Sequence, residues 1–286
     1  MGTASTKPAK NKTGKKTLDQ KIDVAGKTGV LSLCDHKIEQ LPGIVFGLQN
    51  LRILDLSKNK LKVLPDKISS LQKLKSLNIS ENKLSAGSVN SISSLSALQT
   101  LLIGKNQLGI KKNVSEKLER GGNYNILPDL PSGIKQLKIE QNSLTSIPMQ
   151  MFSLTKLEKL DLSCNKISII PSEISKLINL TELNLDHNNL VSVPEECGEL
   201  KKLKSLSLRG NRIHVTSTKF SETNPQPLPS VLFTSTPVID LNLQGNDLTN
   251  TQLNEFKGFS SFLERRKEVK SKNLGALSDL SVCGLE

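Results

Sequence analysis

Apolar residues recur along this chain in one fixed pattern that predicts its fold. From Leu51 onward leucines alternate with polar residues until an asparagine, Asn59, in the arrangement L-x-x-L-x-L-x-x-N-x-L. The next copy brings Asn82, 23 residues later, and a Leu-Pro or Val-Pro pair follows several copies. Alternation of this kind predicts a half-buried strand, and the fixed period predicts a solenoid whose units stack on one another.

The asparagine position repeats eight times, and a histidine, His36, occupies the same position in an earlier copy. An asparagine side chain offers two donors and an acceptor, so it can satisfy backbone groups where the chain turns out of a strand. We therefore predict a structural ladder, and a structural rather than metal-binding or catalytic role for His36. The ladder consists of Asn59, Asn82, Asn106, Asn142, Asn165, Asn188, Asn211 and Asn246.

The predicted architecture is an α/β solenoid, a horseshoe with a parallel sheet on its concave face and a helical cap at each end. Repeats are expected over residues 29–248, with insertions near 111–126 and 216–227, where the asparagine spacing stretches. Such insertions map to loops on one face, often a binding face. The second insertion is rich in Ser, Thr and Pro, so it is either a regulatory loop or a tolerated surface insertion.

The N-terminal segment divides into a tail and a cap. Residues 1–16 are rich in lysine and have little to bury, so we expect them to be disordered. Residues 17–28 predict a cap helix that begins at a capping box of Thr17 and Gln20 and ends at Gly26. Such a helix would cover the open end of the first repeat.

The C-terminal segment predicts a second cap helix over residues 249–272. Thr249 and Gln252 have the spacing of a capping box, and three phenylalanines follow at helical spacing. An aromatic stripe beside the last repeat favours a cap over a membrane-surface helix. Residues 273–286 are expected to form a disordered tail.

The composition of the chain limits the cellular compartments and the classes of partner that we expect. The formal net charge is +12, which favours acidic partners. We find no apolar run long enough to span a membrane and no secretory signal peptide. The four cysteines are widely scattered, unlike the clustered disulfide caps of secreted repeat proteins, so we expect a reducing, cytoplasmic location.

The first six residues match the pattern for N-myristoylation at Gly2, with Thr6 at the Ser/Thr position. Five lysines follow before residue 17. One acyl chain binds membranes weakly, and a polybasic stretch is the usual second signal. The sequence therefore predicts association with an anionic membrane surface, against the alternative of an ordinary solvated basic tail.

The repeat register predicts which side chains line the concave face and could contact a partner. Seven acidic and five basic residues in this set make the face mildly acidic, while residues 1–27 and 257–286 hold most of the positive charge. Nucleic acid would require a basic stripe with stacking aromatics, so this face favours a protein partner. The set is Asp55, Lys58, Asn78, Glu81, Lys105, Lys138, Glu140, Lys159, Asp161, Glu182, Asp186, His187, Arg209 and Asp240.

The sequence contains no motif for catalysis, a cofactor or a metal ion. C-x-x-C and H-E-x-x-H pairs are absent from the chain. Cys164 and His187 share a register and could form a nucleophile–base pair, but no third group orients them. We therefore predict a protein that is not an enzyme and has no cofactor.

Two flanking sequences and the repeats between them resemble a known family. They are Gly26–Leu33, Leu253–Phe259 with Leu263–Arg266, and eight repeats of the Leu-Pro type. Together they resemble the intracellular leucine-rich-repeat proteins of the Ras-group and Scribble-like class, over roughly residues 17–272. The resemblance implies a horseshoe that binds proteins, and N-myristoylation in some members.

These observations predict a monomeric, non-enzymatic scaffold or adaptor that binds a partner protein on its concave face, with signalling at a membrane as a candidate role. Nucleic-acid association through the basic tails is the alternative from a different class. A third hypothesis, a regulatory subunit of a phosphatase or small GTPase, rests on the family resemblance alone.

Overall fold

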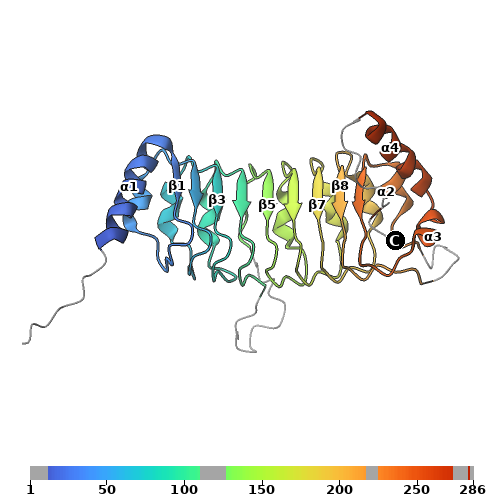
Figure 1. The fold of residues 1–286 in the computed structure, drawn as a ribbon, viewed down its shortest axis with the longest axis horizontal. Helices are drawn as coiled ribbons and strands as arrows, with labels where there is room; N and C mark the ends of the chain where they lie inside the picture. Colours follow the sequence, from blue (N-terminus) through green and yellow to red (C-terminus); the bar gives the residue numbers. More distant parts are fainter. Residues whose placement is uncertain (1–11, 110–126, 217–224, 273–282, 284–286) are drawn as a thin grey trace, which may run out of the picture.

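The computed structural model describes residues 12–109, 127–216, 225–272 and residue 283 of the chain. Nine short strands form one parallel sheet, and each strand pairs with the strand that precedes it in the sequence (Figure 1). This arrangement confirms the predicted repeat solenoid. The strands are β1 (Val30–Ser32), β2 (Ile53–Asp55), β3 (Ser76–Asn78), β4 (Thr100–Leu102), β5 (Gln136–Lys138), β6 (Lys159–Asp161), β7 (Glu182–Asn184), β8 (Ser205–Ser207) and β9 (Asp240–Asn242).

Short helices form the convex side of the repeats. In each described 3₁₀ helix that follows an x-Pro pair, the proline is the residue just before the helix; Pro171, for example, has φ −74°. Proline has no N–H to leave unpaired and its φ is already fixed, so it suits a helix start. The helices are η1 (Gly43–Gly47), η2 (Asp66–Ser70), η3 (Asn90–Ser94), η5 (Met149–Ser153), η6 (Ser172–Lys176), η7 (Glu195–Glu199) and the α-helix α2 (Ser230–Thr234).

The core lies between the sheet and the convex helices and is almost wholly aliphatic. Leu183 at the centre of β7 and Ile174 in η6 are both 2% exposed or less. The same positions are buried in repeat after repeat, which produces one continuous cluster along the solenoid. Each repeat buries its apolar face only against its neighbours, so stability depends on the stack.

The ladder asparagines bind the backbone of two neighbouring repeats. The Nδ2 group of Asn165 donates to the carbonyls of Leu162 and Ser163 in its own repeat and to that of Ile139 in the preceding one. Its Oδ1 accepts from the backbone N–H of Leu144 at 2.9 Å. All eight asparagines make contacts of this type, and His36 is bound through Asn59, which accepts from its N–H at 3.1 Å.

The N-terminal cap differs from the prediction at both ends. Helix α1 (Lys12–Thr28) begins five residues before Thr17, so residues 12–16 belong to the helix and Thr17 is not its N-cap. Gly26 lies inside the helix. The residue that ends it is Gly29, whose φ is +74° and whose N–H donates to the carbonyl of Ala25. An added Cβ at Gly29 would come within 2.8 Å of a backbone oxygen, which explains why glycine stands there.

The C-terminal cap consists of two helices where one was predicted. Helix α3 (Asn250–Asn254) begins at Thr249, and the predicted capping box with Gln252 is confirmed. Gly258, at φ +88°, then reverses the chain before α4 (Phe259–Lys272). The two helices pack over the last repeat at the red end of the solenoid (Figure 1). Helix α3 has already ended at Asn254, and the left-handed conformation of Gly258, which glycine adopts without steric cost, lies directly before α4.

One residue of the predicted C-terminal tail is ordered against the sheet. Cys283 is buried, and its carbonyl accepts from the N–H of Leu243 at 2.8 Å, directly after β9. The prediction of disorder throughout residues 273–286 is therefore wrong at this position. An edge strand presents unpaired backbone groups, and this contact satisfies one of them.

Residues 1–11 and the predicted insertion near 111–126 lie outside the described residues, as does most of the insertion near 216–227.

Candidate functional site

The concave face carries a shallow polar groove of about 350 Å³ across strands β5 to β8. Two rows of outward side chains cross these strands in parallel register, one at the first residue of each strand and one at the last. The groove contains five of the predicted residues, namely Lys138, Lys159, Asp161, Glu182 and Asp186. It also contains Gln136, Asn184, Ser205 and Ser207, which the register could have identified as neighbours.

Serine hydroxyls and backbone N–H groups hold the aspartates of the groove in place. Oδ1 of Asp161 accepts from the N–H and the hydroxyl of Ser163, at 3.0 and 2.7 Å. Oδ1 of Asp186 accepts from the hydroxyl of Ser207 at 2.6 Å and from the N–H of Arg209 at 2.8 Å. Each carboxylate is thus oriented before a partner arrives, which lowers the ordering cost of binding.

Ion pairs between neighbouring strands neutralise part of the face. Lys159 Nζ lies 2.6 Å from Glu182 Oε1, and Lys105 Nζ lies 3.4 Å from Glu81 Oε1. These side chains are 39–51% exposed, so each pair contributes little to stability. With the two pairs set aside, five predicted acids and three predicted bases remain. The predicted acidic surplus is therefore carried by the unpaired groups.

Glu140 is the most perturbed acid of the concave face. Its carboxylate lies over Gly104 in the preceding repeat, where an added Cβ would come within 2.0 Å of Oε1. Oε2 is buried and has no hydrogen-bond partner among the described residues. Burial raises the pKa of Glu140, an effect that Asp161 reinforces and that its own backbone N–H, Lys138 and Lys105 oppose. A cationic group of a partner would stabilise the ionised form of this carboxylate.

Replacing Glu140 with glutamine is expected to stabilise the protein at neutral pH. The folded pKa lies above its ordinary value of 4.5, so ionisation costs the folded state free energy as the pH rises through the folded pKa. Below the ordinary value both states are protonated and this cost disappears. Thermal unfolding of both proteins between pH 4 and pH 7 measures the difference, which should be largest at pH 7 and close toward pH 4. A constant difference across this range would contradict the assignment.

Several predicted contact residues lie in the turns after the strands and not on the sheet. Lys58, Glu81, Lys105 and His187 directly precede a ladder asparagine and all have φ between +53° and +57°. This left-handed conformation turns the chain away from the strand direction. These four residues are therefore corrected to the rim of the sheet, at the carboxyl ends of β2, β3, β4 and β7. The register alone could not show this, because it carries no backbone angles.

The remaining predicted residues lie along the sheet outside the groove. Asp55 and Asn78 occupy the last positions of β2 and β3, where each accepts from the N–H two residues further on. Asp240 begins β9 and accepts from the hydroxyl of Ser205 at 2.8 Å. Arg209 follows β8 and is exposed. The predicted set thus spans the length of the solenoid, and its densest part is the groove over β5 to β8.

The candidate Cys164–His187 pair is not assembled as a nucleophile and base. No hydrogen bond joins the two side chains in the described part of the chain, and the ring of His187 lies over Gly210 in the following repeat, away from Cys164. Burial raises the pKa of Cys197 to about 12, so that thiol stays protonated. No group of three or more His, Cys, Asp or Glu residues that could hold a metal ion occurs among the described residues.

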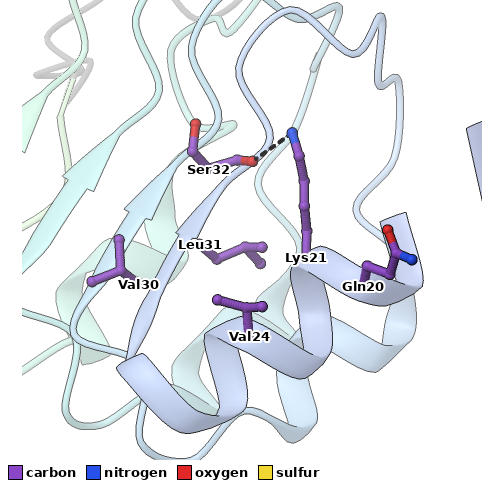
Figure 2. Close-up of a pocket in the computed structure, with 6 residues that line it drawn as sticks. All are labelled: Gln20, Lys21, Val24, Val30, Leu31 and Ser32. Carbon is purple, nitrogen blue, oxygen red and sulfur yellow. Dashed lines mark hydrogen bonds between the residues drawn. The ribbon is translucent and has the colours of Figure 1, made fainter. Parts of the chain in front are cut away.

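A second hollow, of about 470 Å³, lies between α1 and the edge strand β1 (Figure 2). The side chains of Val24 and Leu31 approach each other there, and Lys21 reaches across to the carbonyl of Ser32 at 3.4 Å. Its one charged side chain is this lysine. The hollow offers fewer directed polar groups than the groove, so the groove is the stronger candidate.

No described helix is both long and apolar enough to cross a bilayer.

Comparison with known proteins agrees with this geometry. A family model described as Leucine rich repeat matches residues 29–84, 49–108 and 132–190. A leucine-rich-repeat protein of Leptospira interrogans, LIC12759, is 31% identical with a TM-score of 0.58, and the match covers 82% of this chain and 58% of that one. A plant peptide hormone receptor, RGFR1, solved in complex with RGF2, is 27% identical with a TM-score of 0.54, over 76% of this chain and 32% of the receptor chain.

The chain therefore spans less than two thirds of the length of either structure. A search of curated proteins found no match.

Proposed function

We propose, since this chain belongs to the leucine-rich-repeat family, that it is a non-enzymatic scaffold that binds a partner protein in the groove over β5 to β8. Within the family, the Leu-Pro repeats and cap sequences resemble the intracellular Ras-group and Scribble-like class, including leucine-rich repeat-containing protein 57. The observation that supports the proposal best is the set of pre-oriented carboxylates, Asp161 and Asp186, beside the buried carboxylate of Glu140.

This arrangement favours a partner segment with basic and hydrogen-bonding side chains. Oδ2 of Asp161 and of Asp186 accepts no hydrogen bond from the described residues, while Oδ1 of each is fixed. A lysine or arginine of the partner could pair with these oxygens without displacing the internal contacts. Complementary charge of this kind sets specificity and association rate.

Charge reversal in the groove tests the proposal. The test protein carries Asp161→Lys and Glu182→Lys. Asp186 is kept because its carboxylate binds Ser207 and Arg209 of the following repeat, whereas the carboxylate of Asp161 binds Ser163 of its own repeat. We expect at least about tenfold weaker binding of the partner, since opposed charges become like charges across the interface. Partners are captured from nuclease-treated lysate, identified, and then measured as purified proteins.

The matched control carries Glu173→Lys and Glu195→Lys in η6 and η7, on the convex side of the same part of the solenoid. It has the same change in net charge and should bind as wild type does. Equal loss of binding in both proteins would overturn the groove as the site. Loss of capture by nuclease alone would favour the nucleic-acid alternative. Both variants should unfold at the wild-type temperature.

Membrane association through Gly2 is a second part of the proposal, supported by the match of residues 1–6 to the acylation pattern and by the lysines that follow. The location we propose is cytoplasmic, with part of the protein held at an anionic membrane. Mass spectrometry of the N-terminal peptide from protein made in eukaryotic cells tests the acylation of Gly2. An unmodified Gly2 would contradict membrane association through an acyl chain. A regulatory role toward a phosphatase or small GTPase would appear as the identity of the captured partner.

A further inference from the structure

The turns that lead into the strands carry an unusual excess of positive charge. Seven such turns, residues 49–52, 72–75, 96–99, 132–135, 155–158, 178–181 and 201–204, enter β2 to β8. They contain eight basic side chains, all of them exposed, and one acid, Glu158. We call these eight residues the basic edge: Arg52, Lys73, Lys75, Lys135, Lys156, Lys201, Lys202 and Lys204.

Backbone hydrogen bonds join the turns of the basic edge into one continuous row. The N–H of Lys75 donates to the carbonyl of Arg52 at 2.8 Å, and the same contact continues from turn to turn as far as Lys204. The strands that follow are neighbours in one sheet. At the usual strand spacing of about 4.8 Å, the six steps from β2 to β8 give a row roughly 29 Å long.

Little of this charge is neutralised within the protein. Lys135 pairs with Glu158 at 3.1 Å, and Lys201 lies 3.8 Å from Glu199 of η7. Lys73 and Lys202 donate to neutral amide oxygens, those of Asn50 and Asn179, at 2.9 and 2.6 Å.

With Glu158 included, the seven turns have a net charge of +7, which equals the surplus of the two terminal segments together. The terminal segments hold +7 of the formal net charge of +12, as predicted, and the turns add a second concentration of positive charge that the rest of the chain offsets.

The turns of the basic edge are regular. Each has four residues, and five of the seven share one backbone contact; for example, the N–H of Gln72 donates to the carbonyl of Ser70, and the N–H of Lys201 donates to the carbonyl of Glu199. Both insertions leave the solenoid from the opposite edge, after the ladder asparagines, between residues 109 and 127 and between 216 and 225. The turns of the basic edge therefore contain neither insertion.

We propose that the basic edge docks the solenoid edge-on against an anionic phospholipid surface. A continuous row of positive charge suits an extended anionic surface. Seven of the eight bases are lysines, which act as point charges and do not bind phosphate in a bidentate way. The turns contain no aromatic side chain that could stack on the bases of single-stranded nucleic acid. Clusters of four to eight basic residues are typical of binding to anionic lipid.

Edge-on docking is compatible with the proposed protein partner and independent of it. The groove is lined by residues of the strands β5 to β8 and by Asp186, whereas the basic edge belongs to the turns before the strands, so the two sites share no residue. The proposal needs neither the groove nor acylation at Gly2. Its failure would leave the groove proposal unaffected.

Vesicle binding by the full, unacylated chain tests the proposal. The edge variant carries glutamine in place of Lys73, Lys75, Lys202 and Lys204. The matched control carries glutamine at four exposed bases that follow ladder asparagines at the opposite edge, Lys60, Lys83, Lys166 and Arg212. Both lose four positive charges, and both should unfold at the wild-type temperature.

Partitioning is measured on phosphatidylcholine vesicles with and without phosphatidylserine, at about 0.1 M salt. Wild type should bind only the anionic vesicles, and the edge variant about 100-fold more weakly, since each basic residue near such a surface adds to the attraction. The control should stay within a few-fold of wild type.

Equal weakening of the two variants would overturn the proposal, because binding would then follow net charge and not the edge. Absence of wild-type binding to anionic vesicles would overturn it too. Binding of duplex DNA that depends on the edge, without vesicle binding, would assign the edge to nucleic acid instead.

Discussion

Replacing Asn165 with alanine is expected to lower the free energy of unfolding by about 3–5 kcal/mol. Oδ1 of this side chain accepts from the N–H groups of Asn142 and Leu144, and Nδ2 donates to three carbonyls, including that of Ile139. Asn165 is 7% exposed, so water cannot replace these five contacts. Buried N–H and carbonyl groups left without partners cost the protein their full desolvation penalty.

Chemical denaturation monitored by circular dichroism measures this loss. The matched control is Asn179→Ala. This asparagine lies in the turn before β7, donates to the carbonyl of Thr155 at 2.7 Å and is not buried. The control should lose less than about 1 kcal/mol, since water can satisfy what it leaves behind. Equal losses would show that burial in the ladder is not the cause.

Replacing Phe262 with alanine should cost about 3–5 kcal/mol, the usual range for a buried aromatic residue. The side chain is fully buried in the C-terminal cap, and its ring centroid lies 5.5 Å from that of Phe259 and 6.2 Å from that of Phe233. Phe233 belongs to α2 of the last full repeat, so this cluster attaches α4 to the solenoid. Loss of the cluster should expose the end of the stack.

The loss at Phe262 should also be local, because repeats contact only their neighbours. Limited proteolysis followed by mass spectrometry should therefore show the first new cleavages after residue 229. The substitution Phe262→Leu keeps much of the apolar volume and should recover more than half of the lost stability. First cleavages near α1 instead would contradict the attachment role of the cluster.

The sequence alone determined the repeat fold. Strand positions such as Leu54 and the turn position of Asn59 recur within one short period, and local alternation is enough to identify them. The capping box of Thr249 and Gln252 was predictable for the same reason, because its two members are three residues apart. The acidic positions of the concave face follow from the same alternation of side chains along a strand.

Other features depended on backbone angles that the pattern does not contain. Gly26 and Gly29 both have the residue type of a helix end, and only the φ of +74° at Gly29 shows which one ends α1. The left-handed turns likewise moved Lys58 and His187 from the sheet to its rim. Residue type limits these angles, and packing selects among them.

Only the tertiary structure decided which distant residues meet. Glu140 and Gly104 are 36 residues apart, across a stretched repeat, and the carboxylate fills the space that a Cβ would occupy. The basic edge arises because basic residues spread over more than 150 residues of sequence stack into one row. A repeat period specifies each unit, but the surface charge and the buried contacts between units depend on how the units stack.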